Sequence, residues 1–173
     1  REPGVLSINQ GDGTFCDASK LAGPAIQQNR VLRGLAAGDL FNDGNIDLVV
    51  EDLDGLPMIL RNEGAPENHW ISFELQGTKS NRLAIGAKLK IQAGRLVQTS
   101  EIHSGGSYLS QHDLRVHFGL GPTTKVDSVE VQWPSGAVDR IPGSELAADK
   151  FYYVLEGKGL VRADQVRPKK LSQ

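Results

Sequence analysis

Three aspartates at a fixed spacing form the pattern in this chain that most clearly indicates chemistry. Asp39, Asp43 and Asp47 lie four residues apart, and Gly44 directly follows the second of them. Calcium is a hard cation that prefers oxygen ligands, and a tight turn with several acidic side chains can direct their oxygens to one point. Gly44 permits the left-handed backbone that such a turn needs. We therefore predict a calcium site, and the alternative is a solvated turn that binds no ion.

The residues after these aspartates indicate which element positions them. An apolar run follows the turn at Ile46, Leu48, Val49 and Val50, which is typical of a strand that leaves the loop. The predicted element is therefore a loop followed by a strand. It differs from an EF-hand, which places its loop between two helices and carries a glutamate at the twelfth position.

This stretch resembles the FG-GAP/VCBS repeat, the blade unit of integrin-like β-propellers, whose loop reads D-x-D-x-D-G-x-x-D. The resemblance implies calcium ligands at Asp39, Asp43, the carbonyl of Asn45, and Asp47. The third position departs from the pattern, because Phe41 stands where an acidic or amide ligand is expected. That departure leaves one coordination place to water or to nothing.

Length and composition favour an all-β protein and exclude several function classes. The chain has 173 residues, of which 20 are glycine, and Gly-rich turns separate short apolar runs. A net charge of -2 gives no electrostatic footprint for nucleic acid. Apolar runs stay well short of the ~20 residues that span a bilayer, and a single cysteine, Cys16, excludes an internal disulfide. The start at Arg1 shows no signal peptide in this piece. We expect a C-terminal fragment of a larger secreted protein, because a propeller closes with ~4–8 blades and residues 1–64 supply only one or two.

The predicted fold is all-β, with a partial β-propeller blade followed by a small antiparallel β-sandwich or barrel. We predict a repeat segment at 1–64, a β-domain at 65–160 and a tail at 161–173. Alternating residues such as Val129, Val131 and Trp133 share one face of a strand. The predicted core of the β-domain contains Leu89, Phe118, Val131 and Trp133. We also expect the repeat segment to fold back onto the β-domain through apolar residues, namely Ile46, Leu48, Val50, Ile59 and Leu60. The alternative is that it pairs with another copy of itself, and the short linker favours folding back.

The second part resembles the ASPIC/UnbV domain over roughly residues 68–157. Five motifs carry the resemblance in the order of that family, at 77–82, 84–87, 106–111, 117–121 and 131–136. The family typically places this domain directly after FG-GAP/VCBS repeats. Its members resemble secreted or extracellular proteins, and no chemistry is established for it. The resemblance therefore implies an architecture and an extracellular location rather than an activity.

Two of these motifs carry polar residues that suggest a binding patch. A patch for a sugar or a carboxylate would combine one loop with the other, using Lys79, Asn81, Arg82, Ser110 and Gln111. The alternative is that these side chains cap backbone groups of long loops. Neither interpretation requires a reaction.

Other candidate sites are weaker. The four histidines show no convergent zinc spacing, and Ser107 lacks the G-x-S-x-G turn of a hydrolase. We therefore predict a non-catalytic, calcium-associated binding or adhesion module that is extracellular and takes a protein or glycan ligand. The alternative is an enzyme, or an accessory domain of one, that acts on a carbohydrate or a metabolite. A convergent cleft of titratable groups would distinguish the second hypothesis from the first.

Overall fold

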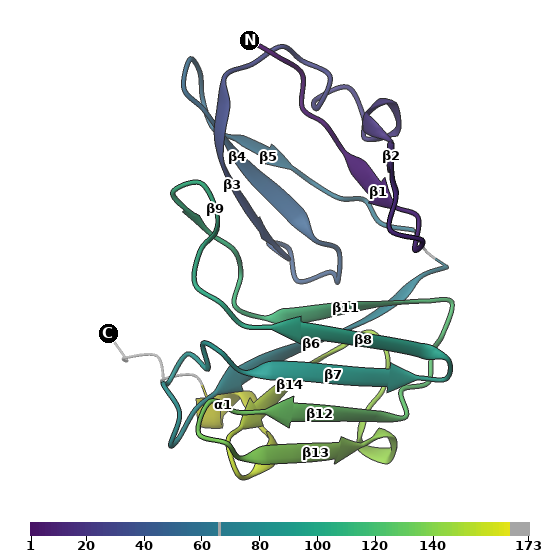
Figure 1. Ribbon diagram of the computed structural model, residues 1–173, viewed down its shortest axis with the longest axis vertical. Coiled ribbons are helices and arrows are strands. Elements are labelled where there is room, and N and C mark those ends of the chain that lie inside the picture. Colours follow the sequence, from purple (N-terminus) through teal and green to yellow (C-terminus); the bar gives the residue numbers. More distant parts are fainter. Residues whose placement is uncertain (66, 167–173) are drawn as a thin grey trace.

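The computed structural model describes residues 1–65 and 67–166, and β-strands dominate it (Figure 1). Two parts follow one another along the chain. We call residues 1–64 the N-terminal segment and residues 67–166 the β-domain. In Figure 1 the N-terminal segment lies above the β-domain, and a hairpin at the label β9 extends from the β-domain to strand β3.

The N-terminal segment contains a hairpin and a three-stranded antiparallel sheet. Its elements are β1 (Ser7–Asn9), β2 (Phe15–Asp17), the 3-10 turn η1 (Ser19–Leu21), β3 (Leu32–Gly38), β4 (Asp47–Asp52) and β5 (Met58–Leu60). The sheet has the order β3-β4-β5, with Leu48 opposite Ala37 on one side and Leu60 on the other. Every residue of β1 and β2 is exposed. The segment thus has little core of its own.

Two four-stranded sheets face one another in the β-domain. One sheet has the order β11-β6-β14-β15 and the other the order β13-β12-β7-β8. The first sheet contains β6 (His69–Gln76), β11 (Val116–Gly121), β14 (Lys150–Leu155) and β15 (Gly159–Val161). The second contains β7 (Lys88–Ala93), β8 (Leu96–Glu101), β12 (Ser128–Gln132) and β13 (Val138–Pro142). Smaller elements are β9 (Gly106–Ser107), β10 (Ser110–Gln111), η2 (Gly143–Glu145) and α1 (Ala163–Val166).

Alternation along the strands builds the core between these sheets. In β7 the burial alternates at every residue, which places Leu89, Ile91 and Ala93 inside. Strand β12 pairs with β7 so that Val131 lies opposite Leu89. Phe73 of β6 is fully buried, with its ring 6.4 Å from that of Phe118. The predicted core of Leu89, Phe118, Val131 and Trp133 is confirmed, because all four are buried.

The all-β prediction is confirmed, and the β-domain is a sandwich rather than a closed barrel. One pairing departs from the antiparallel expectation, because β14 runs parallel to β6, with Tyr152 opposite Phe73. A strand pattern gives the inward face of each strand but not its neighbour, so this pair was not visible in the sequence. Part of the predicted tail is ordered: α1 contacts β14 and buries Val166, while residues 167–173 lie outside the described residues. No helix among the described residues is long and apolar enough to cross a membrane.

Trp133 provides a test of this core. The Trp133→Ala variant should lose on the order of 3–5 kcal/mol of unfolding free energy, because a large buried ring leaves a cavity. Its indole N–H also donates to Asp139 at 2.8 Å. Urea denaturation measures the loss, and Leu83→Ala, at an exposed position, is the matched control. Equal stability of the two variants would contradict the placement of the ring.

Candidate functional site

The predicted calcium loop connects β3 to β4 and is closed by hydrogen bonds to its own backbone. Asp39 is buried, and its two carboxylate oxygens accept from the N–H groups of Asp43 at 3.1 Å and Gly44 at 2.9 Å. Asp47 is buried as well. Its oxygens accept from Leu40 N at 3.1 Å and from Asn62 N at 2.9 Å, which ties the loop to the chain after β5.

Asp43 differs from the other two aspartates because a side-chain cation faces it. One of its oxygens accepts from the backbone N–H of Asn45, and the other lies 3.2 Å from Nη2 of Arg61. The hydrogen bond from the Asn45 backbone is the main cause that lowers the pKa of Asp43; burial opposes it, and Arg61 lowers the pKa further. The Asp43 carboxyl is therefore held in its charged form by partners within the chain.

These residues do not fit a calcium ion as they lie. Calcium takes six to eight oxygen ligands that converge on one point. Among the described residues, no three His, Cys, Asp or Glu side chains converge as a metal-binding group. The third ligand position carries the ring of Phe41, beneath the guanidinium of Arg61. The predicted set of Asp39, Asp43, Asn45 and Asp47 stays a prediction that only an ion-binding measurement can test.

The same loop forms the junction with the β-domain. Gly44 has φ 88, and a Cβ at this position would lie 1.9 Å from the indole of Trp70. The glycine is thus needed for the close approach of Trp70 as well as for the turn. The carbonyl of Gly44 lies 2.8 Å from Nε2 of His117. Because a carbonyl only accepts, this ring nitrogen carries the proton.

Arg115 makes two hydrogen bonds to the N-terminal segment and one within the β-domain. Its guanidinium donates to the carbonyl of Asp39 at 2.6 Å and to Oδ1 of Asn42 at 2.7 Å. Its Nε donates to Asp113 at 2.6 Å, and the ring of Phe151 lies 5.3 Å from its Cζ. A planar guanidinium can bond to several partners at once, since its five donors point in fixed directions. No sequence motif indicated this role for Arg115.

A hairpin arm, residues 104–113, extends from the β-domain along β3. Ala37 of β3 donates its N–H to Nδ1 of His112 at 3.1 Å, and its carbonyl accepts from Asp113 N at 2.9 Å. The arm folds tightly around the His112 ring, because a Cβ on Gly106 would lie 2.3 Å from it. The expected fold-back of the N-terminal segment is present, but this junction is largely polar. Of the residues predicted to make apolar contacts, Ile46 lines a hollow at this junction, whereas Ile59 is 62% exposed.

The first motif of the β-domain forms a cradle for a buried carboxylate, which we call the Glu156 cradle. Three successive backbone N–H groups, from Thr78, Lys79 and Ser80, donate to one oxygen of Glu156 at 2.6–2.7 Å. The hydroxyls of Ser80 and Ser135 donate to the other oxygen. Successive N–H groups that point to one place form an anion-binding nest. The nest is filled by the protein's own glutamate.

The Glu156 cradle determines the charge state of this carboxyl. Burial raises its pKa, but the hydrogen bonds from the Ser135 hydroxyl and from the backbone of Ser80 and Thr78 outweigh burial and lower the pKa to about 2. Glu156 is only 4% exposed. A buried charge of this kind is stable only when its oxygens are fully hydrogen-bonded, as they are here.

Three residues of the predicted ligand patch make hydrogen bonds within their own loops, and the other two have exposed side chains. Asn81 exchanges two hydrogen bonds with the backbone of Ile85, which is a capping role. Ser110 donates to the carbonyl of Tyr108, and Gln111 accepts from Gly105 within the arm. Lys79 and Arg82 have exposed side chains. Across the described residues, no hydrogen bond or ion pair joins the 79–82 loop to Ser110 or Gln111, so the patch stays a prediction.

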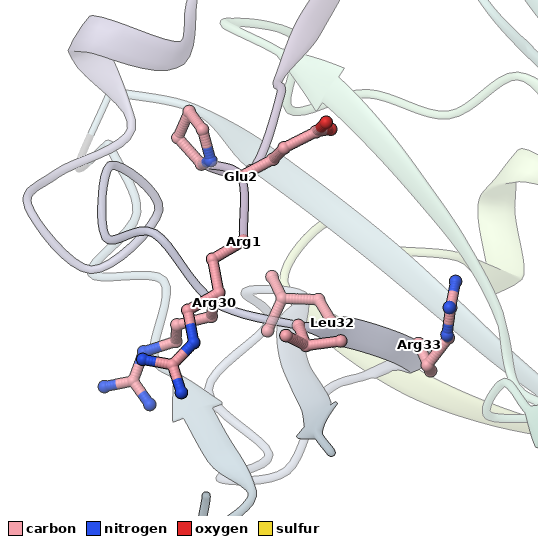
Figure 2. A pocket seen from close by; sticks show the side chains of 8 residues that line it. Arg1, Glu2, Arg30, Leu32 and Arg33 are labelled. Carbon is pink, nitrogen blue, oxygen red and sulfur yellow. The ribbon is translucent and has the colours of Figure 1, made fainter. Parts of the chain in front are cut away.

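Two surface hollows were not visible in the sequence. A pocket of about 370 Å³ is lined by Arg1, Glu2, Arg30 and Arg33 among others (Figure 2). It does not gather an anion site, because Arg1 pairs with Asp54 and Arg30 with Asp52, and Arg33 projects away from both.

The second hollow, which we call the junction cleft, lies at the junction between the two parts and has a volume of about 420 Å³. It is lined by polar and aromatic side chains that include Asn45, Asn62, His69, Trp70 and His117. His69 lies beside it with Nδ1 2.7 Å from a carboxylate oxygen of Asp149.

The Glu156 cradle predicts a defined dependence of stability on pH. Glu156→Gln should cost about 3 kcal/mol of unfolding free energy at neutral pH, given a pKa lowered from 4.5 to about 2. Because the folded-state pKa is the lower one, this contribution is complete above about pH 4.5 and is lost as the pH falls toward 2. Chemical denaturation across this range measures it. Glu101→Gln, on the exposed edge of β8, should stay within about 0.5 kcal/mol of wild type.

The junction should loosen in mild acid. Burial lowers the pKa of His117, while the Gly44 carbonyl and Asp39 raise it and Arg115 lowers it. The folded-state pKa therefore lies below 6.5, and stability is lost as the pH falls from 6.5 toward it. NMR titration of the Gly44 amide and the His117 ring should show a midpoint below 6.5. A midpoint above 6.5, or an equal Gly44 response in His117→Asn and in the exposed-site control His103→Asn, would contradict this.

Comparisons with known proteins identify a family that matches most of the β-domain. Residues 77–161 match the family described as ASPIC and UnbV. Cartilage acidic protein 1 of Xenopus tropicalis is 26% identical over 141 residues, which cover 79% of this chain and 20% of that protein. The Mus musculus and Homo sapiens proteins of the same name are each 28% identical over 138 residues, 78% of this chain and 21% and 20% of theirs. The chain thus spans about one fifth of the length of these curated relatives. The matches bear out the ASPIC/UnbV part of our prediction, over residues 77–161.

Proposed function

We propose that this chain is a non-catalytic binding or adhesion module of a secreted protein. Its similarity to proteins named for cartilage, an extracellular tissue, supports the location. The polar residues of the ASPIC/UnbV motifs make hydrogen bonds within the fold, which supports a non-catalytic role. Thr78, Ser80 and Ser135 hold Glu156, and Asn81 caps the backbone of Ile85, so these groups stabilise the fold and are not directed at a substrate.

We further infer that β3–β5 is part of an FG-GAP/VCBS blade. An aspartate-rich loop between its first two strands supports this, as does the three-stranded antiparallel order. The N-terminal segment also exposes many large apolar side chains: Val5, Ile8, Phe15, Leu21, Leu53, Leu56 and Ile59. Exposed apolar patches of this kind mark surfaces that other protein covers. Neighbouring blades would cover them in the longer protein.

The tip of the hairpin arm is the observation that carries the binding role. Tyr108 and Leu109 form the two-residue turn between β9 and β10, and they are 64% and 89% exposed. Leu109 also has φ 47, a left-handed conformation that is unfavourable for a leucine. The arm is nevertheless fixed by His112 and Asp113 on β3. A rigid arm that presents an apolar, strained tip to solvent is suited to contact a protein or glycan ligand.

An enzymatic role is the second candidate, and a single pair of residues favours it. His69 and Asp149 lie beside the junction cleft, and a carboxylate that orients an imidazole is a common arrangement in general base catalysis. The same aspartate also accepts from Trp70 N and donates its own N–H to the Trp70 carbonyl, which ties β14 to β6. A panel of glycoside and ester substrates separates the two candidates. Turnover that disappears in His69→Ala would favour the enzyme.

The tip predicts a variant that separates binding from stability. Leu109→Gly removes an exposed side chain and relieves a left-handed conformation that costs about 1–2 kcal/mol, so stability should rise or stay equal. Binding should weaken about tenfold or more, as for an apolar anchor of an interface. The chain is first screened on a glycan array and on purified matrix proteins, and affinity for the strongest binder is then measured by surface plasmon resonance.

Leu83→Ser is the control for this test, since Leu83 is an exposed leucine outside the arm. It should bind as wild type does. A Leu109→Gly variant with unchanged affinity would exclude the tip as the contact. The absence of any ligand in the screen, together with turnover of a substrate, would overturn the proposed function.

A further inference from the structure

Phe41 and Arg61 form a pair that gives the loop an internal cation. The Cζ of Arg61 lies 4.5 Å from the centre of the Phe41 ring, and its Nη2 lies 3.2 Å from Oδ2 of Asp43. Phe41 occupies the third position of the loop, where the repeat pattern requires a ligand. We propose that Arg61, seated on Phe41, holds the Asp39–Asp47 loop in place of a metal ion.

The first step concerns what the loop needs. Its carboxylates crowd negative charge into one turn, which must be balanced if Asp39 and Asp47 are to stay buried. In a calcium loop the ion supplies that balance. Here the backbone supplies part of it, because both oxygens of Asp39 and both oxygens of Asp47 accept N–H groups. Asp43 is the aspartate of the loop whose oxygen faces a side-chain cation.

The second step concerns Phe41. An aromatic ring offers nothing to a calcium ion, which takes oxygen ligands at short range. The face of the same ring attracts a guanidinium, which is planar, permanently charged and only weakly hydrated. The phenylalanine that removes a metal ligand therefore creates a platform for Arg61. The presence of Phe41 therefore explains both why the loop fits a calcium ion poorly and why Arg61 lies where it does.

Arg115 provides a second internal cation for the loop. It donates to the carbonyl of Asp39 and to the amide oxygen of Asn42, two neutral oxygens of the same turn. The backbone of Asn42 is left-handed, with φ 55, and the hydrogen bond from Arg115 to its side-chain oxygen stabilises this turn. The loop thus contacts two guanidiniums, that of Arg61 directly after β5 and that of Arg115 from the β-domain.

The proposal makes the loop independent of calcium, whether or not the module binds a ligand. Thermal unfolding of the wild-type chain should give the same Tm in millimolar calcium and in a chelator. Arg61→Ala should lower Tm by about 2–4 °C, the shift expected when one modest interaction is lost from a chain of this size. Calcium should not restore it. Arg33→Ala, at an exposed arginine of β3, is the matched control and should leave Tm unchanged.

A variant designed to gain calcium binding provides the second test of the proposal. Phe41→Asp restores the missing ligand and removes the platform, so its Tm should fall in chelator and rise on addition of calcium, by mass action. If this variant does not fold, isothermal titration of calcium into the wild type still decides the question. Calcium binding by the wild type that Asp43→Ala abolishes would overturn the proposal. A Tm of Arg61→Ala equal to that of Arg33→Ala would overturn it as well.

Discussion

The buried carboxylate of Glu156 fixes the geometry of two loops of the β-domain, the one after β6 and the one after β12. It lies at the end of β14 and receives hydrogen bonds from the loop after β6 and from the loop after β12, which belong to different sheets. Because an unpaired buried charge is strongly unfavourable, both loops must keep their geometry for the sandwich to close. Gly77 shows how tight this loop is, since a Cβ there would lie 2.2 Å from the carbonyl of Asn81. The motif around it is therefore a structural requirement.

The same logic extends to the junction of the two parts. The N-terminal segment has few buried apolar residues, so its position is determined by specific polar contacts and one close steric fit. Trp70 rests on Gly44, Arg115 reaches the backbone of Asp39, and His112 meets Ala37. These contacts fix the hairpin arm and its exposed tip relative to β3. The proposed binding role follows from this rigidity, because an ordered arm loses little entropy when it meets a ligand.

The sequence predicted elements better than it predicted partners. Alternation in 88–92 and 128–133 identified two core strands and the buried Trp133, because a period of two is visible without tertiary information. Short β13 and the parallel pair of β6 and β14 were missed, since a strand's neighbour is set by topology. Glu156 was missed for the same reason. A glutamate before a glycine is typical of an exposed turn, and nothing local shows that three N–H groups from residues 78–80 surround it.

The aspartate loop is a second case in which the local structure was predicted but its partner was not. Its spacing indicated a tight acidic turn correctly, and Gly44 was assigned its left-handed conformation. The partner of the turn was not visible, because Arg61 lies 18 residues after Asp43 and belongs to the chain after β5. The predicted ligand patch shows a different difficulty, since Asn81 and Gln111 bond to residues four and six positions away within their own loops. Side-chain type alone does not distinguish a group that binds a ligand from one that stabilises a loop.

The most direct test of this account is the titration of Glu156 itself. Carbon-detected NMR of the side-chain carboxyl follows its protonation in the folded protein. The account predicts that Glu156 stays ionised down to about pH 2, because the hydrogen bonds from residues 78–80 and Ser135 favour the charged form. A midpoint near the ordinary value of 4.5 would show that the Glu156 cradle does not hold the charge, and would contradict the structural role assigned to this motif.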